Sequence, residues 1–237
     1  MKPASFTYHA PKTVEETVAL LAEHAADDGR ILAGGQSLVP TMAFRLARPP
    51  HLIDINNVDG LDRLEVDGDS LHIGARVRHA AFHTPVCDGP LGALLSTVVA
   101  KIAHLPIRLR GTFCGSVAHA DPASEWCLVT ATLDGEMVAM KKGGERRIAA
   151  RDYFEGVMST ALAEDELLAA VRLPMPAEGT KFGFQEFSRR AGDFAIAMAL
   201  ATYRIEDGRI ADAHIGIGGA EDRPRRITEA EDALNGK

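Results

Sequence analysis

The sequence predicts a mixed α+β fold, and three patterns along its 237 residues indicate this class. Residues 3–55 alternate apolar runs with amphipathic runs in a β-α-β-α-β order. Residues 56–176 contain the hairpin signals Asp67-Gly68 and Gly143-Gly144. Residues 177–237 are typical of an antiparallel three-stranded meander, with Asp207-Gly208 expected to form the turn of its last pair. We therefore expect three subdomains with the bounds 1–55, 56–176 and 177–237.

The first subdomain begins with a clear helix signal. Thr13 and Glu16 form a T-x-x-E capping box, in which each residue satisfies a free backbone amide of the first helical turn. Apolar residues then recur at helical spacing, and Gly29 is expected to stop the helix. The other elements expected here are strands at 31–33 and 51–55 and a helix at 38–46.

The second subdomain is expected to mix buried helices with strands. Residues 91–104 are apolar enough for a buried helix, which Pro106 should end. Residues 110–120 are rich in small side chains and predict a loop. Asp121-Pro122 has the form of an N-cap followed by a proline in the first helical turn. The strands expected after it and in the third subdomain lie at 136–141, 146–149, 167–173, 181–188, 195–205 and 210–217, with a final helix from 226.

Composition excludes several classes of protein. The net charge of -7 and a pI near 5.7 argue against a nucleic-acid-binding protein and against a polybasic membrane anchor. There is no apolar run of the length of a transmembrane helix, and the N-terminus lacks the apolar core of a signal peptide. Three widely spaced cysteines without a C-x-x-C pair predict neither disulfides nor a metal site in this chain. We expect a cytoplasmic protein.

Two loops point to an anionic ligand. Ala33-Gly34-Gly35-Gln36-Ser37 follows an apolar strand, and adjacent glycines let backbone amides approach a phosphate closely. The loop matches neither the G-x-G-x-x-G pattern nor a Walker loop, so a plain tight turn is an equal alternative at this point. Residues 110–125 form a second loop of small and hydroxyl residues. Two such loops in one acidic α/β chain suggest a single diphosphate ligand held from both sides, with the carboxylate of Glu125 available to sugar hydroxyls.

The motifs resemble those of a known family. Ala33-Gly34-Gly35-x-Ser37, the segment 111–125 (Gly-Thr-x-x-Gly-Ser-x-Ala-His-Ala-Asp-Pro-Ala-x-Glu) and the segment 187–195 (Phe-Ser-Arg-Arg-Ala-Gly-Asp-Phe-Ala) occur in this order. Together they are similar to the FAD-binding medium subunits of molybdenum hydroxylases, the relatives of carbon monoxide dehydrogenase and xanthine dehydrogenase. The resemblance covers residues 1–235.

The resemblance implies a p-cresol-methylhydroxylase-type FAD-binding fold. Two α/β subdomains would hold FAD noncovalently between them, and a C-terminal subdomain would lean on the flavin region. Residues 32–39 would wrap the pyrophosphate, and residues 112–116 would line the diphosphate and ribityl chain. The residues expected to contact FAD are Leu32, Ala33, Gly34, Gly35, Gln36, Ser37, Leu38, Val39, Ala103, Thr112, Cys114, Gly115, Ser116 and Glu125.

The same resemblance implies an electron-transfer subunit of an oxidoreductase complex. A large partner subunit would oxidise the organic substrate at a molybdenum cofactor. Electrons would pass through a small partner subunit with two [2Fe–2S] clusters to the FAD of this chain, and then to an external acceptor. The family suggests a dimer of heterotrimers. No catalytic residue is expected in this chain, because the cofactor performs the redox chemistry. Two alternatives stay open: a self-contained flavin oxidoreductase, and a non-enzymatic assembly subunit that has lost FAD.

The sequence departs from the family pattern in three places. Cys114 stands where many members have a glycine, so its backbone must adopt angles that a side chain tolerates. Glu186 stands where some members carry a lysine near the flavin. The chain is some tens of residues shorter than the family pattern, so we expect the C-terminal subdomain to lack its last helices.

Several conspicuous residues have simpler explanations. Asp121 is expected to be an N-cap, and Trp126 a core or interface residue. His119 is expected to pack in its loop or at the flavin edge, since its surroundings lack the spacing of a compact metal site. Arg189 and Arg190 suggest a surface that faces a partner or simply a solvated strand.

Overall fold

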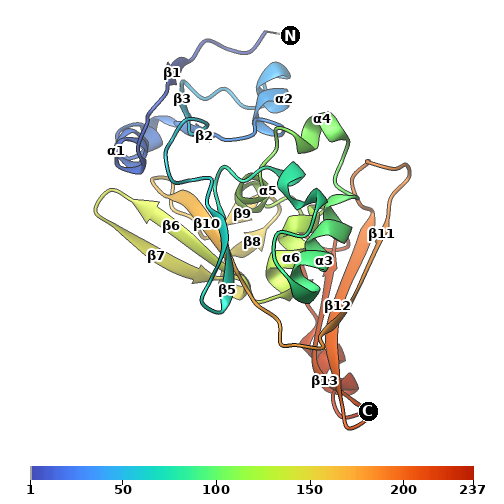
Figure 1. The fold of residues 1–237 in the computed structure, drawn as a ribbon. Helices are drawn as coiled ribbons and strands as arrows, with labels where there is room; N and C mark the ends of the chain where they lie inside the picture. Colours follow the sequence, from blue (N-terminus) through green and yellow to red (C-terminus); the bar gives the residue numbers. More distant parts are fainter. Residues whose placement is uncertain (1) are drawn as a thin grey trace.

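The computed structural model describes residues 2–237 as three larger sheets and one two-stranded sheet, with helices between and around them (Figure 1). The mixed α+β class expected from the sequence is confirmed. The three larger sheets occupy successive stretches of the chain, and the boundaries proposed at 55/56 and 176/177 fall between them. In this part of the chain no helix is both long and apolar enough to cross a membrane.

The N-terminal sheet has the expected β-α-β-α-β order. Its elements are β1 (Thr7–His9), α1 (Val14–His24), β2 (Arg30–Leu32), α2 (Leu38–Ala43) and β3 (His51–Asp54), and a 3₁₀ turn at Ala25–Asp27 follows α1. The strand order is β1-β3-β2, and both pairs are parallel. The capping box is present, since the amide of Glu16 donates to Thr13 Oγ1 at 3.1 Å. Helix α1 buries Val18 and Leu21 against this sheet.

The central sheet has five antiparallel strands. They are β4 (Leu64–Asp67), β5 (Ser70–Gly74), β6 (Glu136–Lys141), β7 (Gly144–Ala149) and β10 (Leu167–Pro174), in the order β4-β5-β10-β6-β7. Both predicted hairpins are therefore confirmed. Strand β10, which comes later in the sequence than the other four, lies between β5 and β6 and joins the two hairpins into one sheet. A short hairpin, β8 (Phe154–Gly156) and β9 (Ser159–Thr160), precedes it.

Four helices follow β5, and two of them correct the sequence prediction. They are α3 (Gly89–Val99), α4 (Leu105–Arg108), α5 (Phe113–His119) and α6 (Glu125–Thr132). The expected loop at 110–120 contains α5, because Thr112 caps it by accepting a hydrogen bond from the amide of Gly115 at 3.0 Å. The prediction that Asp121 caps a helix was wrong. Its carboxylate instead accepts from the nearby amide of Ala123 at 2.9 Å, and the helix begins only at Glu125.

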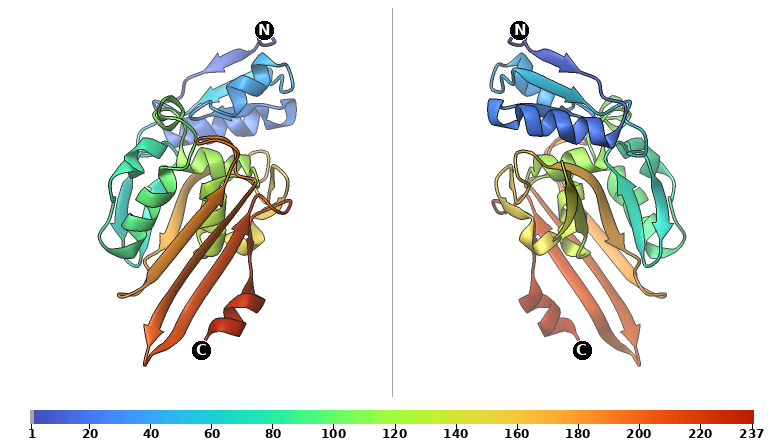
Figure 2. Two further views of the ribbon diagram at one scale, coloured as in Figure 1. Left: turned by 90° about the vertical axis from the view of Figure 1, so that its right-hand side faces the viewer. Right: turned by 90° about the vertical axis from the view of Figure 1, so that its left-hand side faces the viewer.

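The C-terminal subdomain is a long antiparallel sheet that projects from the rest of the molecule (Figure 2). Its strands are β11 (Lys181–Phe187), β12 (Ala197–Glu206), β13 (Arg209–Gly218) and β14 (Arg225–Arg226), followed by α7 (Thr228–Leu234). The expected meander of three strands is present, and the two residues of β14 add a fourth that the sequence did not reveal. The turn Asp207-Gly208 lies between β12 and β13 as expected.

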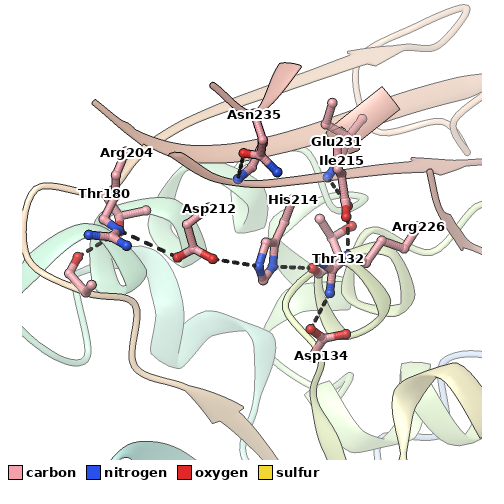
Figure 3. A network of polar contacts seen from close by, with 12 residues as sticks. Thr132, Asp134, Thr180, Arg204, Asp212, His214, Ile215, Arg226, Glu231 and Asn235 are labelled. Atoms are coloured by element: carbon pink, nitrogen blue, oxygen red, sulfur yellow. Dashed lines mark hydrogen bonds and ion pairs between the residues drawn. The ribbon is translucent and has the colours of Figure 1, made fainter. Parts of the chain in front are cut away.

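Helices α5 and α6 connect the central sheet to the C-terminal sheet. Helix α5 contacts β5 and β10, while α6 contacts β12 and β13. A Cβ atom on Gly216 in β13 would lie 1.9 Å from Thr132 Oγ1 on α6, so the strand and the helix pack without room for a side chain. Polar contacts continue this seam (Figure 3): Arg226 binds both Asp134 and Glu231, and His214 Nδ1 lies 3.2 Å from the carbonyl of Thr132.

Candidate FAD-binding site

A cavity of about 690 Å³ lies between the N-terminal subdomain and the central subdomain. Its walls are residues 33–38 of the β2–α2 loop, residues 111–119 around the start of α5, and residues 158–168 between β9 and β10. Both loops that the sequence predicted to hold an anion therefore line one cavity. The volume falls in the range typical of small-molecule sites.

The first loop depends on two glycines. Gly35 has φ +72, a left-handed angle that side-chain-bearing residues rarely adopt. A Cβ atom on Gly34 would lie 2.5 Å from the carbonyl oxygen of Arg110 and 2.6 Å from the Cα of Gly111. The two loops are thus in direct backbone contact, and only glycine permits it.

The second loop also contains glycines that pack closely against neighbouring residues. A Cβ atom on Gly115 would lie 2.5 Å from Thr112 Oγ1 and 4.0 Å from the Cβ of Ala33. On Gly111 it would lie 2.5 Å from His79 Nε2. The absence of side chains at Gly111 and Gly115 therefore lets this loop pack closely against Thr112 and His79 at the cavity wall.

A chain of hydrogen bonds fixes the first loop to the sheet. Asn56 Nδ2 donates to the carbonyl of Ala33 at 2.8 Å, and Asn56 is itself held by the buried carboxylate of Asp54. Tyr8 on β1 donates to the same carboxylate, and Arg78 of the central subdomain donates to Asn56 Oδ1. The loop is therefore positioned from both subdomains. The sequence analysis did not identify these residues, because no local motif marks a contact between residues so far apart.

His79 is a further cavity residue that the sequence analysis missed. Its Nδ1 accepts a hydrogen bond from Trp126 Nε1 at 2.9 Å, so its proton is carried by Nε2. Burial, with the nearby charges of Arg78 and Arg108, lowers the pKa of His79 to about 4, and the ring is neutral at pH 7. His79 therefore offers a neutral N–H donor at the cavity wall. Trp126 is fully buried against Phe82 and Phe113, as expected for a core residue.

Most of the residues that the sequence analysis named for FAD lie at this cavity. Its lining includes all of residues 33–38, together with Thr112, Cys114, Gly115 and Ser116, and also His119. Leu32, Val39, Ala103 and Glu125 do not line it, and their contact with FAD stays a prediction. Burial, followed by the negative charges of Glu186 and Asp121, raises the pKa of Glu125 to about 7. The raised pKa favours the protonated carboxyl group, which can donate as well as accept a hydrogen bond.

Cys114 lies in the first turn of α5 with its side chain in the core. It is only 2 % exposed, and its Sγ lies 3.3 Å from the carbonyl oxygen of Ile73. Burial raises the pKa of the thiol, so it carries no thiolate at neutral pH. The backbone is helical at this position, which is why a cysteine is accommodated where the family pattern has a glycine.

Cys114→Gly is therefore expected to retain FAD. The replaced thiol is buried against the carbonyl of Ile73, so the flavin content should stay within twofold of that of the unsubstituted chain. Loss of the buried side chain and a glycine within a helix should lower the free energy of unfolding by about 1–2 kcal/mol. Flavin absorbance near 450 nm and urea unfolding measure the two effects. Loss of FAD from a folded variant would show that the thiol itself supports the cofactor.

The chain matches two family models, one after the other. Residues 4–176 match the FAD binding domain in molybdopterin dehydrogenase. Residues 182–237 match the C-terminal domain of CO dehydrogenase flavoprotein. The two matches together cover nearly the whole chain, and the cavity lies within the first of them.

Similar proteins include medium subunits of several hydroxylases and dehydrogenases. The nicotine 6-hydroxylase medium subunit of Paenarthrobacter nicotinovorans is 40% identical, and the match covers 100% of this chain and 82% of the relative. The carbon monoxide dehydrogenase medium chain of Afipia carboxidovorans is 35% identical over the same shares of both chains. The solved structure of reconstituted CO dehydrogenase from Oligotropha carboxidovorans superposes with a TM-score of 0.96 at 34% identity, covering 100% of this chain and 82% of that one. The chain belongs to the family of FAD-binding medium subunits of molybdopterin dehydrogenases.

Proposed function

We propose that this chain holds FAD noncovalently in the cavity between its first two subdomains, with the diphosphate against the two glycine loops. The observation that carries the proposal is the direct backbone contact of Gly34 with Arg110 and Gly111, which brings the two loops to one wall. FAD, when bound, supplies a group that takes up electrons singly and releases them singly or in pairs. The three-subdomain division proposed from the sequence agrees with a ligand held between the first two.

The residues of this chain would bind and orient the cofactor. Residues 33–38 would present backbone amides to phosphate oxygens, and Ser37 and Ser116 would add their hydroxyls. His79 Nε2–H would add a donor that stays neutral at physiological pH. Arg30 is the basic side chain at the cavity wall, and its partner Asp28 lies 2.5 Å away. Because Asp28 offsets the charge of Arg30, backbone dipoles rather than cationic side chains would hold the diphosphate.

We further propose the route by which the chain takes part in catalysis. A small partner subunit with [2Fe–2S] clusters would deliver electrons to this chain from a large molybdenum-cofactor subunit, and the chain would pass them to dioxygen, NAD or a quinone-linked carrier. Relatives named for nicotine, caffeine and carbon monoxide support a complex of this kind without naming its substrate. A dimer of heterotrimers is the proposed assembly.

The isolated chain is expected to bind FAD but to oxidise no organic substrate. The cavity residues form no nucleophile–base pair, and the chain's loops serve the cofactor. A steady-state assay with aldehydes and N-heteroaromatic compounds and an artificial dye as acceptor tests this, first with the chain alone and then with both partner subunits added. Activity should appear only in the complete mixture. Substrate-dependent dye reduction by the chain alone, with molybdenum and iron shown to be absent, would favour a self-contained flavin oxidoreductase.

A further inference from the structure

Three histidines from different parts of the N-terminal subdomain converge on one point. His9 ends β1, His51 begins β3, and His24 is the last residue of α1. One ring nitrogen from each lies within 4.8 Å of those of the other two. All three residues are partly buried, and none of them lines the FAD cavity. The cluster is therefore separate from the cofactor site.

The backbone places these side chains together. Strands β1 and β3 are parallel, with Thr7 beside His51 and His9 beside Ile53. His9 and His51 are thus two positions apart on adjacent strands and share one face of the sheet. Helix α1 covers this face with its last turn at the same end.

The end of α1 is fixed by a close contact. A Cβ atom on Gly29 would lie 2.7 Å from the carbonyl oxygen of His24 and 2.8 Å from its Cβ. The chain therefore turns back tightly against His24, and glycine is required there. This tight turn fixes the position of His24, the third histidine of the cluster.

The ring nitrogens lie close enough together to share a cation. His9 Nε2 lies 3.0 Å from His51 Nδ1, and the rings of His24 and His51 stack with centroids 3.9 Å apart. Zinc binds imidazole nitrogen at about 2.0–2.1 Å, which separates two tetrahedral ligand atoms by about 3.4 Å. The three nitrogens already lie within 4.8 Å of one another, so binding of one ion would require rotation of the stacked rings of His24 and His51.

The surrounding charge also favours a cation. His24 ends an eleven-residue helix, and the C-terminal end of a helix carries a partial negative charge. The carboxylate of Glu23 lies 3.8 Å from His24 Nε2 and is exposed, so it can swing in as a fourth ligand. Three imidazoles and one carboxylate are a ligand set suited to borderline divalent metals.

We propose that His9, His24 and His51 form a binding site for a divalent transition-metal cation of the zinc class, with Glu23 as fourth ligand. The cation would tie the short edge strand β1 and the end of α1 to β3. These elements carry the first glycine loop, since β2 pairs with β3 and leads into that loop. The site would therefore stabilise the half of the cavity that the N-terminal subdomain provides.

The test is zinc binding by the full chain, purified without a polyhistidine tag and stripped with a chelator. Isothermal titration with ZnCl₂ should show one Zn²⁺ bound per chain. His24→Ala and His51→Ala should each weaken this binding at least tenfold, while His83→Ala, which removes an exposed histidine elsewhere, should leave it unchanged. Co²⁺ in place of Zn²⁺ should give the visible absorption bands of a four-coordinate site in the unsubstituted chain and in His83→Ala, but not in His24→Ala or His51→Ala.

Two results would overturn the proposal. One is the lack of stoichiometric Zn²⁺ binding by the unsubstituted chain. The other is that His24→Ala and His51→Ala bind Zn²⁺ as tightly as the unsubstituted chain does. Far-UV circular dichroism shows that each variant is folded. Because His24 lies at a helix end, its replacement leaves the core intact and keeps the test valid even where His51→Ala fails to fold. Zn²⁺ should also raise the thermal midpoint of the unsubstituted chain and not that of His24→Ala.

Discussion

Gly35→Val is expected to leave the chain with less than a tenth of its flavin. Gly35 has φ +72, and a β-branched residue is strongly disfavoured at this angle. Its Cβ would also lie 3.1 Å from Val39 Cγ2 and 3.3 Å from Leu32 Cδ1. The loop must therefore change its path at the point where it would meet the diphosphate. The ratio of absorbance near 450 nm to protein concentration, after purification in the presence of FAD, measures the loss.

Gly68→Val is the matched control for this variant. Gly68 has φ +65 in the turn between β4 and β5, and a Cβ atom added to it would have no neighbouring atom within 4 Å. The same backbone strain, about 1–2 kcal/mol, is thus introduced far from the cavity. The control should keep its FAD. Full flavin content in folded Gly35→Val would refute the assignment of the diphosphate, whereas loss in both variants would point to general destabilisation.

Gly216→Val is expected to lower the free energy of unfolding by about 3 kcal/mol. A Cβ at this position would lie 1.9 Å from Thr132 Oγ1 and 2.9 Å from Leu128 Cδ1. Either β13 moves away from α6 or the helix shifts, and both changes open the seam between the central and C-terminal subdomains. Equilibrium unfolding in urea measures the change.

Three further substitutions show whether crowding at position 216 is the cause of the lost stability. Gly183→Val on β11 has no atom within 4 Å of its virtual Cβ and is exposed, so valine should leave stability unchanged or raise it. Thr132→Ala removes the hydroxyl that a side chain at 216 would meet, so Gly216→Ala should be less destabilising in that background. Equal losses in both backgrounds would show that the clash with Thr132 is not what limits position 216.

Local signals predicted much of the fold. The capping box of Thr13 and Glu16 and the three hairpin turns depend on neighbouring residues, and each appears where it was expected. Helix α5 was missed because its residues are small and lack an apolar periodicity, although Thr112 begins it as a capping residue. Asp121-Pro122 was misassigned because an aspartate makes the same short-range hydrogen bond in a turn as at a helix start.

The sequence predicted the two loops of the candidate site but not the residues that hold these loops in place. The two glycine loops are continuous in sequence, and the cavity contains most of their residues. Asn56 and Arg78 hold the first loop, and Trp126 orients His79, through contacts across 22 to 47 residues, which no local pattern encodes. The same is true of β10, whose place between β5 and β6 depends on long-range pairing. The histidine cluster likewise joins positions 9, 24 and 51, which share no motif.

The backbone contact between Gly34 and residues 110–111 has a thermodynamic consequence. Each of the first two subdomains supplies one wall of the cavity, so a ligand that spans both walls binds only when they are docked. Ligand binding and docking of the two subdomains are then linked equilibria. Once the free ligand exceeds its dissociation constant, each further tenfold rise in its concentration stabilises the docked form by about 1.4 kcal/mol. The concentration of free ligand would in this way set the fraction of chains in the docked form, and ligand-free chains would open first between these two subdomains.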